Sequence, residues 1–275
     1  MELGIFAKTF EGSSPEIILQ QAATAGYQAV QYNMACSGIG SLPTQISDAV
    51  AAAVSAASAA TGIRIAAVSA TYNMTHPDLA VRANGRGAFA AIASQARTMG
   101  TDLVTVCTGS MDPVDQWRRH PENDSSEAWI EMLREFGRII PIAEQYDLVL
   151  GIEPELSNII SSTHKARVLI DTLKSDRIKI VLDAANLFEV ESDHRREHLI
   201  FEAIHVLDDA IVMAHAKDRK ADGSFTAAGK GVIDFPRYVE LLASIGFSGT
   251  LVTHGLAADE AAGVARYLAP LVKTA

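Results

Sequence analysis

The stretch LVLGIEPELSNIISSTHKARVLIDTLKSDRIKIVLDAAN, residues 148–186, contains the pattern that decides the fold. It opens on the apolar run Leu148–Ile152, continues through the helical segment Thr163–Leu173, and ends on a second apolar run, Ile178–Leu182. Both runs are short and rich in Leu, Ile and Val, as strands covered on both faces of a parallel sheet should be. The stretch therefore predicts a strand, a crossover helix and a parallel strand.

The same unit recurs along the whole chain. We predict eight strands, at Leu3–Phe6, Ala29–Tyr32, Ile65–Ser69, Leu103–Cys107, Leu148–Ile152, Ile178–Leu182, Ile211–Ala214 and Thr250–Val252. The predicted helices are Pro15–Ala25, Thr44–Thr61, Asp78–Met99, Ser125–Tyr146, Thr163–Leu173, Arg196–Leu207, Phe235–Ile245 and Asp259–Lys273. Pro15 in a first helical turn, with Gly26 and Gly62 directly after helix ends, is typical of helix boundaries.

Eight units of strand then helix predict a (β/α)8 TIM barrel, an α/β fold, rather than a doubly wound sheet. A doubly wound sheet usually has fewer strands and a glycine-rich turn after the first one, whereas residues 6–10 read FAKTF. No linker divides the chain, so we expect a single domain over residues 1–275. The longest loops, Thr108–Asp124 and Lys217–Asp234, follow strand ends, where a barrel builds its active site.

The composition excludes several classes of protein. Hydrophobic residues make up 48% and charged residues 20%, which is ordinary globular usage and argues against gross disorder. The apolar stretch Ala49–Ala60 is broken by Ser and is too short to span a bilayer, so we expect no membrane association. A net charge of −10 disfavours nucleic acid as a partner. Two cysteines and a first strand without a basic leader predict a cytoplasmic protein with reduced thiols.

Ionisable side chains follow four consecutive predicted strands, at the end where the active site of a barrel lies. They are Glu153, Asp183, His215 and His254. One carboxylate after a strand is usually a helix cap or a solvated loop residue. Four such groups at one mouth would repel or desolvate one another unless a cation lies between them. We therefore predict one divalent metal ion bound by these four side chains.

The motifs around these residues resemble those of the xylose isomerase-like barrel superfamily. It contains sugar phosphate isomerases and epimerases, tagatose-type 3-epimerases, inosose dehydratases and endonuclease IV. The matching pieces are GIEP (151–154), VLDAAN (181–186), HAKD (215–218) and the glycine-rich GKGVIDF (229–235), and the resemblance covers essentially the whole chain.

The resemblance implies one Mn²⁺, Mg²⁺, Co²⁺ or Zn²⁺ ion held by Glu, Asp, His and a final Glu. This chain departs from the pattern at the last position, where residues 253–255 read THG. We expect His254 to be the substitute ligand, and the alternative is a histidine that contacts substrate or supports the other ligands. Two imidazoles favour Mn²⁺, Co²⁺ or Zn²⁺ over Mg²⁺, and we expect Mn²⁺.

The family chemistry implies a sugar, sugar phosphate or polyol isomerase or epimerase of carbohydrate metabolism. A base removes the proton next to a carbonyl, and the metal stabilises the enediolate that forms. In the 3-epimerases two metal-bound glutamates serve opposite faces of the substrate. Only Glu153 is present here. Either His254 or another acid serves the second face, or the reaction is not a two-base epimerisation, since an aldose–ketose shift needs one face only. Lys217 either acts beside the anionic intermediate or forms a loop ion pair with Asp218.

The remaining candidates would bind substrate. Glu155 shares the face of Glu153 if strand alternation continues. Asn186 holds a position where members of the family often carry a substrate-touching His. His76, after the third predicted strand, either lines the pocket or belongs to the loop that enters the next helix. Trp117, in the long loop after the fourth predicted strand, would form a lid or an anion-binding rim of the pocket. We also expect a homodimer or homotetramer, with Ala49–Ala60 as a helix suited to close packing.

Three alternatives stay open. A dehydratase of the inosose or dehydroshikimate type would use the same metal site. An enzyme like endonuclease IV would need a trinuclear zinc cluster and a basic DNA surface, which the net charge of −10 disfavours. A non-catalytic sugar-binding barrel would have lost its metal, and only the missing final Glu supports it.

Overall fold

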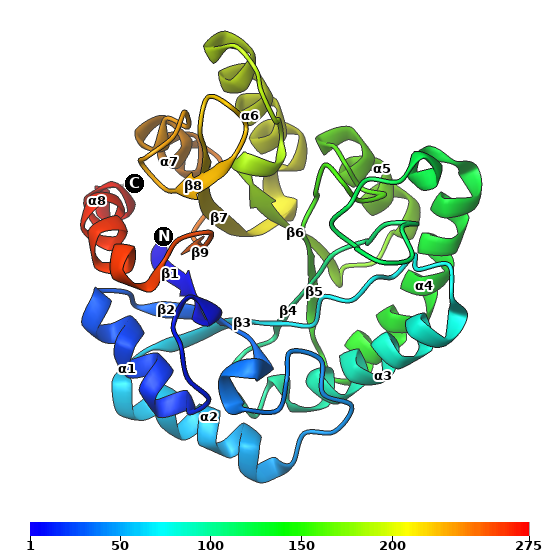
Figure 1. The fold of residues 1–275 in the computed structure, drawn as a ribbon, viewed down its shortest axis with the longest axis horizontal. Coiled ribbons are helices and arrows are strands. Elements are labelled where there is room, and N and C mark those ends of the chain that lie inside the picture. Colours follow the sequence, from blue (N-terminus) through cyan, green and yellow to red (C-terminus); the bar gives the residue numbers. More distant parts are fainter. Residues whose placement is uncertain (275) are drawn as a thin grey trace.

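The computed structural model describes residues 1–274, in which eight parallel strands form a closed barrel surrounded by eight α-helices (Figure 1). The barrel strands are β1 Glu2–Phe6, β2 Ala29–Tyr32, β3 Arg64–Ser69, β4 Leu103–Val106, β5 Val149–Ile152, β6 Ile178–Asp183, β7 Ile211–Arg219 and β9 Thr250–Thr253. The helices are α1 Pro15–Ala25, α2 Asp48–Thr61, α3 Leu79–Ala96, α4 Ser126–Gln145, α5 Thr163–Leu173, α6 Asp193–Leu207, α7 Phe235–Ser244 and α8 Ala261–Thr274. Strands β1 to β7 pair in chain order, and β9 closes the ring between β7 and β1. The predicted TIM barrel is confirmed.

Three helix starts differ from the prediction by more than one residue, and capping explains two of them. Helix α2 begins at Asp48 rather than Thr44, because the Ser47 side chain accepts a hydrogen bond from the third amide of the helix. Ser192 caps α6 in the same way, so that helix begins at Asp193 rather than Arg196. The last predicted helix, Asp259–Lys273, is divided into the 3-10 turn Ala258–Glu260 and α8.

The largest difference is in β7, which was predicted to end at Ala214 and continues to Arg219. Its last three residues pair antiparallel with a short strand that the sequence did not predict, β8 Phe225–Ala227. Three charged residues in a row, at 217–219, have the composition of a loop, which is why the pattern missed the extension. Because side chains alternate along a strand, the extension places Lys217 on the same face as His215.

The barrel interior carries an apolar layer beneath the polar mouth. This layer consists of Ala67, Leu103, Val181, Met213 and Val252, and it is separate from the main core between strands and helices. Asp183 comes two residues after Val181 in β6, and His215 comes two residues after Met213 in β7. Because side chains alternate along a strand, both polar side chains point inward just above the apolar layer. Gly151 belongs to the same layer, where a Cβ would approach Val181 Cγ2 at 2.8 Å.

Within residues 1–274 no helix is both long and apolar enough to cross a membrane. Cys36 and Cys107 are both buried and unpaired, as predicted. Burial raises the pKa of the Cys36 thiol to about 11, which makes it a poor nucleophile. The expectations of one domain and of a homo-oligomer stay predictions.

Candidate metal centre

The four ionisable side chains predicted to bind a metal meet at the carboxyl end of the barrel. One ligand atom from each of them lies within 4.8 Å of the others. Glu153 follows β5, Asp183 ends β6, His215 lies within β7 and His254 follows β9. Asp183 is 1% exposed and His215 is 3% exposed, so both are held within the barrel rather than in solvent.

Asp183 is the centre of this cluster. Its Oδ2 lies 3.0 Å from His254 Nε2, 3.0 Å from Lys217 Nζ and 3.7 Å from His215 Nδ1. Its Oδ1 accepts a hydrogen bond from the Ala185 amide at 2.9 Å. Burial pushes the pKa of Asp183 upward, but Lys217 and the two imidazoles outweigh burial and hold the pKa well below its ordinary value. The carboxylate is therefore anionic across the physiological pH range.

The orientation of His215 is set from the opposite side of the barrel. The side-chain amide nitrogen of Gln31 donates to Ser69 Oγ at 2.9 Å and to Thr105 Oγ1 at 3.0 Å. Its Oε1 is thereby left to accept a hydrogen bond from His215 Nε2, at 2.8 Å. The Nδ1 atom of His215 then faces Glu153 Oε1, 3.3 Å away. Metal-binding histidines are held in this way, with the distal ring nitrogen donating to a fixed acceptor.

Gln31 was not among the predicted site residues. It is a polar side chain in the otherwise apolar β2, and this contrast is the signal that could have found it. Nothing in the local sequence states which side chain it contacts, because His215 is 184 residues away along the chain.

The charges of the cluster balance without a metal. Burial lowers the pKa of His215, but Glu153 and Asp183 outweigh burial and raise it to about 9. Burial raises the pKa of Glu153, but His215 and Lys217 bring it below its ordinary value. Burial and the neighbouring His215 lower the pKa of His254. Two cations, on His215 and Lys217, therefore face two carboxylates, while His254 is neutral.

This donor set fits a divalent cation. It offers two carboxylate oxygens and two imidazole nitrogens, and imidazole suits transition metals better than Mg²⁺. His215 has a fixed partner in Gln31, and Glu153 accepts from Asn186 Nδ2 at 3.0 Å. A cation could replace the proton on His215 as the balancing charge. The cluster therefore suggests a divalent metal site.

The sequence predicted that Asn186 binds substrate, but its side chain is not part of the cavity wall. It is 3% exposed, and its Oδ1 accepts from Lys217 Nζ at 2.8 Å while its Nδ2 holds Glu153. The side chain therefore connects a predicted base to a predicted cation. Both ends of the Asn186 amide are therefore occupied by Glu153 and Lys217.

The alternative prediction of a loop ion pair between Lys217 and Asp218 is wrong. Alternation in the extended β7 turns Asp218 away from Lys217, and its carboxylate accepts hydrogen bonds from the amides of Gly229, Gly231 and Ile233 at 2.9–3.1 Å. A Cβ on Gly231 would approach the Arg219 carbonyl oxygen at 2.0 Å, so only glycine fits there. The glycine-rich stretch after β7 therefore folds around Asp218.

The cluster borders an open cavity of about 560 Å³ at the barrel mouth. Its ionisable wall includes Glu153, Glu155, His215, Lys217 and His254, and its neutral wall includes Gln31, Asn33, Ser69 and Thr71. Glu155 also lines this cavity. Burial raises the pKa of this carboxyl group to about 7, above its ordinary range.

Of the two predicted pocket residues outside the centre, the structure brings only Trp117 to the cavity. Trp117 lies at the rim and is 49% exposed. His76 lines an adjoining hollow that shares Trp117 with the cavity. Its Nδ1 accepts from the Asp78 amide at 3.0 Å, and its Nε2 lies 3.0 Å from the Pro113 carbonyl oxygen. His76 is therefore engaged in the turn before α3.

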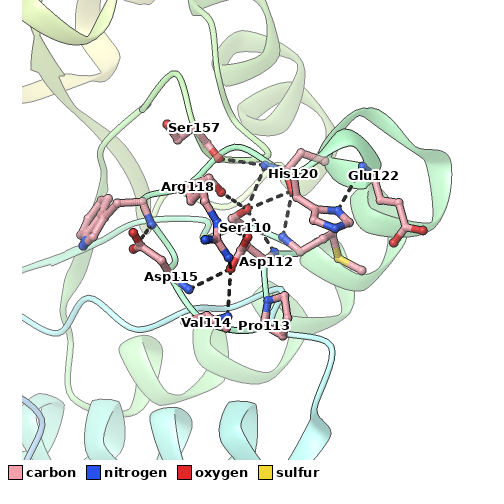
Figure 2. Close-up of polar contacts among 12 residues, drawn as sticks. Ser110, Asp112, Pro113, Val114, Asp115, Arg118, His120, Glu122 and Ser157 are labelled. Carbon is pink, nitrogen blue, oxygen red and sulfur yellow. Dashed lines mark hydrogen bonds and ion pairs between the residues drawn. The ribbon is translucent and has the colours of Figure 1, made fainter.

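The loop that carries Trp117 is folded around Asp112 (Figure 2). The Asp112 carboxylate accepts from Arg118 Nη2 at 2.8 Å and from the Val114 and Asp115 amides, both at 2.9 Å. The Trp117 amide donates to Asp115 Oδ1 at 2.9 Å. These bonds hold the backbone on both sides of Trp117, which places its side chain at the rim.

Comparison with known proteins identifies the family. The sequence profile described as "Xylose isomerase-like TIM barrel" matches residues 19–269. An L-ribulose 3-epimerase has a TM-score of 0.78 at 17% identity, over 99% of this chain and 95% of that one. A D-psicose 3-epimerase with D-tagatose, from Clostridium cellulolyticum H10, has a TM-score of 0.76 at 16% identity, over 99% of both chains. The IOLI protein with a bound zinc atom has a TM-score of 0.73 at 18% identity, over 100% of this chain and 99% of that one.

At these identities the structural similarity shows the fold alone. No curated protein matches the sequence. The family profile covers most of the chain, and the structure has the barrel that the profile describes. This chain belongs to the xylose isomerase-like TIM barrel family.

Proposed function

We propose that this protein is a divalent-metal-dependent isomerase or epimerase of a small neutral sugar or polyol. One observation carries the proposal, namely that four ligand atoms from Glu153, Asp183, His215 and His254 lie within 4.8 Å of one another beside an open cavity. The 3-epimerases among the structural neighbours support this reaction class. We expect Mn²⁺ as the ion.

Glu153 is the base that removes the proton next to the substrate carbonyl. A bound cation would polarise the carbonyl and hydroxyl oxygens and so acidify this proton. The lowered pKa of Glu153 keeps the carboxylate ionised, and Asn186 fixes its orientation with a hydrogen bond of 3.0 Å. Lys217, held cationic by Asp183, stabilises the negative charge that develops on the substrate oxygens as the enediolate forms.

Proton transfer on the opposite face of the substrate needs a second group. His254 holds the strand-end position of the missing glutamate, and its lowered pKa leaves the ring neutral, so it would be this group only if it does not bind the metal. Glu155 lines the same cavity, and burial raises its pKa to about 7, so it can give or take a proton near neutral pH. An aldose–ketose shift would use one face only, whereas an epimerisation would use two.

The carboxylates of the cavity wall favour a neutral substrate over a phosphorylated one, although Lys8 also lines the cavity. Glu155 and Glu189 line the wall, and both would repel a phosphate. Lys217 is already paired with Asp183, and Arg219 Nε donates to the Ala185 carbonyl oxygen at 2.6 Å. These cations are therefore engaged by the protein itself.

A dehydratase on the same centre is the second candidate. Elimination of water requires an acid beside the leaving hydroxyl group. Glu155 favours this alternative, because its raised pKa leaves part of the population protonated at neutral pH.

The test is an NMR assay in D₂O of the Mn²⁺-reconstituted protein with a panel of ketoses, aldoses and inososes. Exchange of a carbon-bound proton next to the carbonyl, without loss of water, is expected. Loss of water from the substrate would support the dehydratase instead. Glu153→Gln should abolish exchange, whereas Glu122→Gln, an exposed change in the 3-10 turn before α4, should leave it unchanged. A protein that binds sugar but supports no exchange with metal bound would be a non-catalytic barrel.

A further inference from the structure

A second hollow adjoins the cavity at the barrel mouth. It has a volume of about 590 Å³, and it shares Thr71, Gln116 and Trp117 with the cavity that contains the metal centre. Each hollow alone is within the range of about 300–1,000 Å³ typical of small-molecule sites. Because three residues border both hollows, the two adjoin at Trp117, and a single sugar ring would occupy only one of them.

The lining of the second hollow contains both apolar and polar side chains, which is the combination that binds sugars. Val81 and Val114 present exposed apolar groups, and Val114 is 82% exposed. Thr44, Asn84 and Asp115 add exposed polar groups to the same lining. Sugar rings offer C–H faces to apolar side chains and hydroxyl groups to polar ones, so both kinds of group would be used.

Trp117 stands between the hollows and is the side chain best suited to bind both parts of one ligand. Half of its surface is exposed, although a tryptophan side chain gains free energy when it is covered. Its position is set by the loop bonds around Asp112 and Asp115 (Figure 2). Because the loop backbone on both sides of Trp117 is already fixed, only the side-chain torsions remain to be ordered when a ligand stacks on the indole.

We infer that the second hollow binds a second sugar ring, so that the substrate is a disaccharide or glycoside whose reacting ring lies at the metal centre. The identity of the reacting ring rests on the proposed function. Binding of the second ring does not, because Val81, Asn84 and Val114 lie outside the catalytic cavity.

Calorimetric binding to the Mn²⁺-loaded protein tests the inference with matched ligands. D-Fructose is the single-ring probe, and lactulose and maltulose carry the same ketose with a second ring attached. We expect at least one two-ring sugar to bind about tenfold tighter than D-fructose or better. Asn84→Trp fills the hollow from α3, and it should remove this advantage while leaving the affinity for D-fructose unchanged.

The control places the same side chain on the same helix outside the hollow. Ala83→Trp is an exposed change on α3 and should preserve the preference for two rings. Thr44→Trp fills the same hollow from the loop before α2. It is a second filling variant that keeps the test valid if Asn84→Trp does not fold.

The outcomes separate this inference from the proposed function. If neither two-ring sugar binds tighter than D-fructose, or if both filling variants leave the preference intact, the second-ring site is wrong. If the two-ring preference depends on the hollow but no sugar in the panel exchanges a carbon-bound proton, the site stands and the proposed isomerase or epimerase is wrong.

Discussion

The two halves of the barrel mouth carry different chemistry. The ends of β5, β6, β7 and β9 carry ionisable groups, whereas the inward-facing polar residues of β2, β3 and β4 are Gln31, Ser69 and Thr105, which are neutral. The ionisable half is ordered by mutual attraction of its charges, and the neutral half by amide and hydroxyl hydrogen bonds. The two meet at the bond between Gln31 and His215. The comparison teaches that the centre depends on the whole ring, because a neutral half orients a ligand of the ionisable half.

Removal of the central carboxylate should break the ionisable half altogether. Asp183→Asn removes a ligand and leaves Lys217 buried without its carboxylate partner. We expect loss of stoichiometric metal and a decrease of about 3–5 kcal/mol in the free energy of unfolding. Elemental analysis and urea unfolding measure both. Asp193→Asn, whose side chain is 97% exposed, is the matched control. Full metal occupancy in Asp183→Asn would contradict the assignment.

The position that departs from the family pattern should give the next largest effect. His254→Ala removes one of four proposed ligands, and metal affinity should fall by more than the roughly 10–100-fold typical of changes around a ligand. His254→Glu restores a carboxylate and should retain metal, with preference moved toward Mg²⁺ or Mn²⁺. Competition with a chelator measures both variants. Unchanged affinity together with reduced turnover in His254→Ala would instead assign this residue to proton transfer.

Metal affinity should rise with pH. Without metal, His215 keeps its proton up to a pKa of about 9, and this proton must leave before Nδ1 can bind a cation. Affinity should therefore rise about tenfold per pH unit below that value, or about a hundredfold from pH 6 to pH 8, and become level above it. The stability of the metal-free fold changes with pH in the opposite direction. The raised pKa stabilises the metal-free fold fully below pH 6.5, and this stabilisation is lost as pH rises through about 9. An affinity independent of pH would show that His215 binds no metal.

The smallest effect should come from the neutral half. Gln31→Leu removes the acceptor that orients His215, and metal affinity should fall by about 10–100-fold without complete loss. Gln31→Glu keeps an acceptor and should recover most of the affinity, which a merely structural defect would not allow. Gln20→Leu, an exposed change on α1, is the control. An affinity unchanged in Gln31→Leu would mean that the two halves act independently.

The order of strands and the candidate ligands were predictable from the sequence because both depend on local patterns. Short apolar runs alternate with helical segments, and this repetition predicted the barrel. Asp183 and His215 each follow an apolar run directly, so the fold alone places them at the mouth. Helix starts were less certain, since Ser47 and Ser192 act through cap bonds that apolar periodicity does not register.

Contacts across the ring were decided by the tertiary structure. The sequence marks Gln31 as a polar residue in a strand, but closure of the barrel between β7, β9 and β1 brings β2 and β7 close enough for its bond to His215. The added pairing with β8 turned a predicted loop residue, Lys217, into a buried cation beside Asp183. The turn before α3 engaged His76 and kept it out of the cavity. Local sequence sets the period and the order of the elements, whereas ring closure and loop folding decide which side chains from distant elements meet.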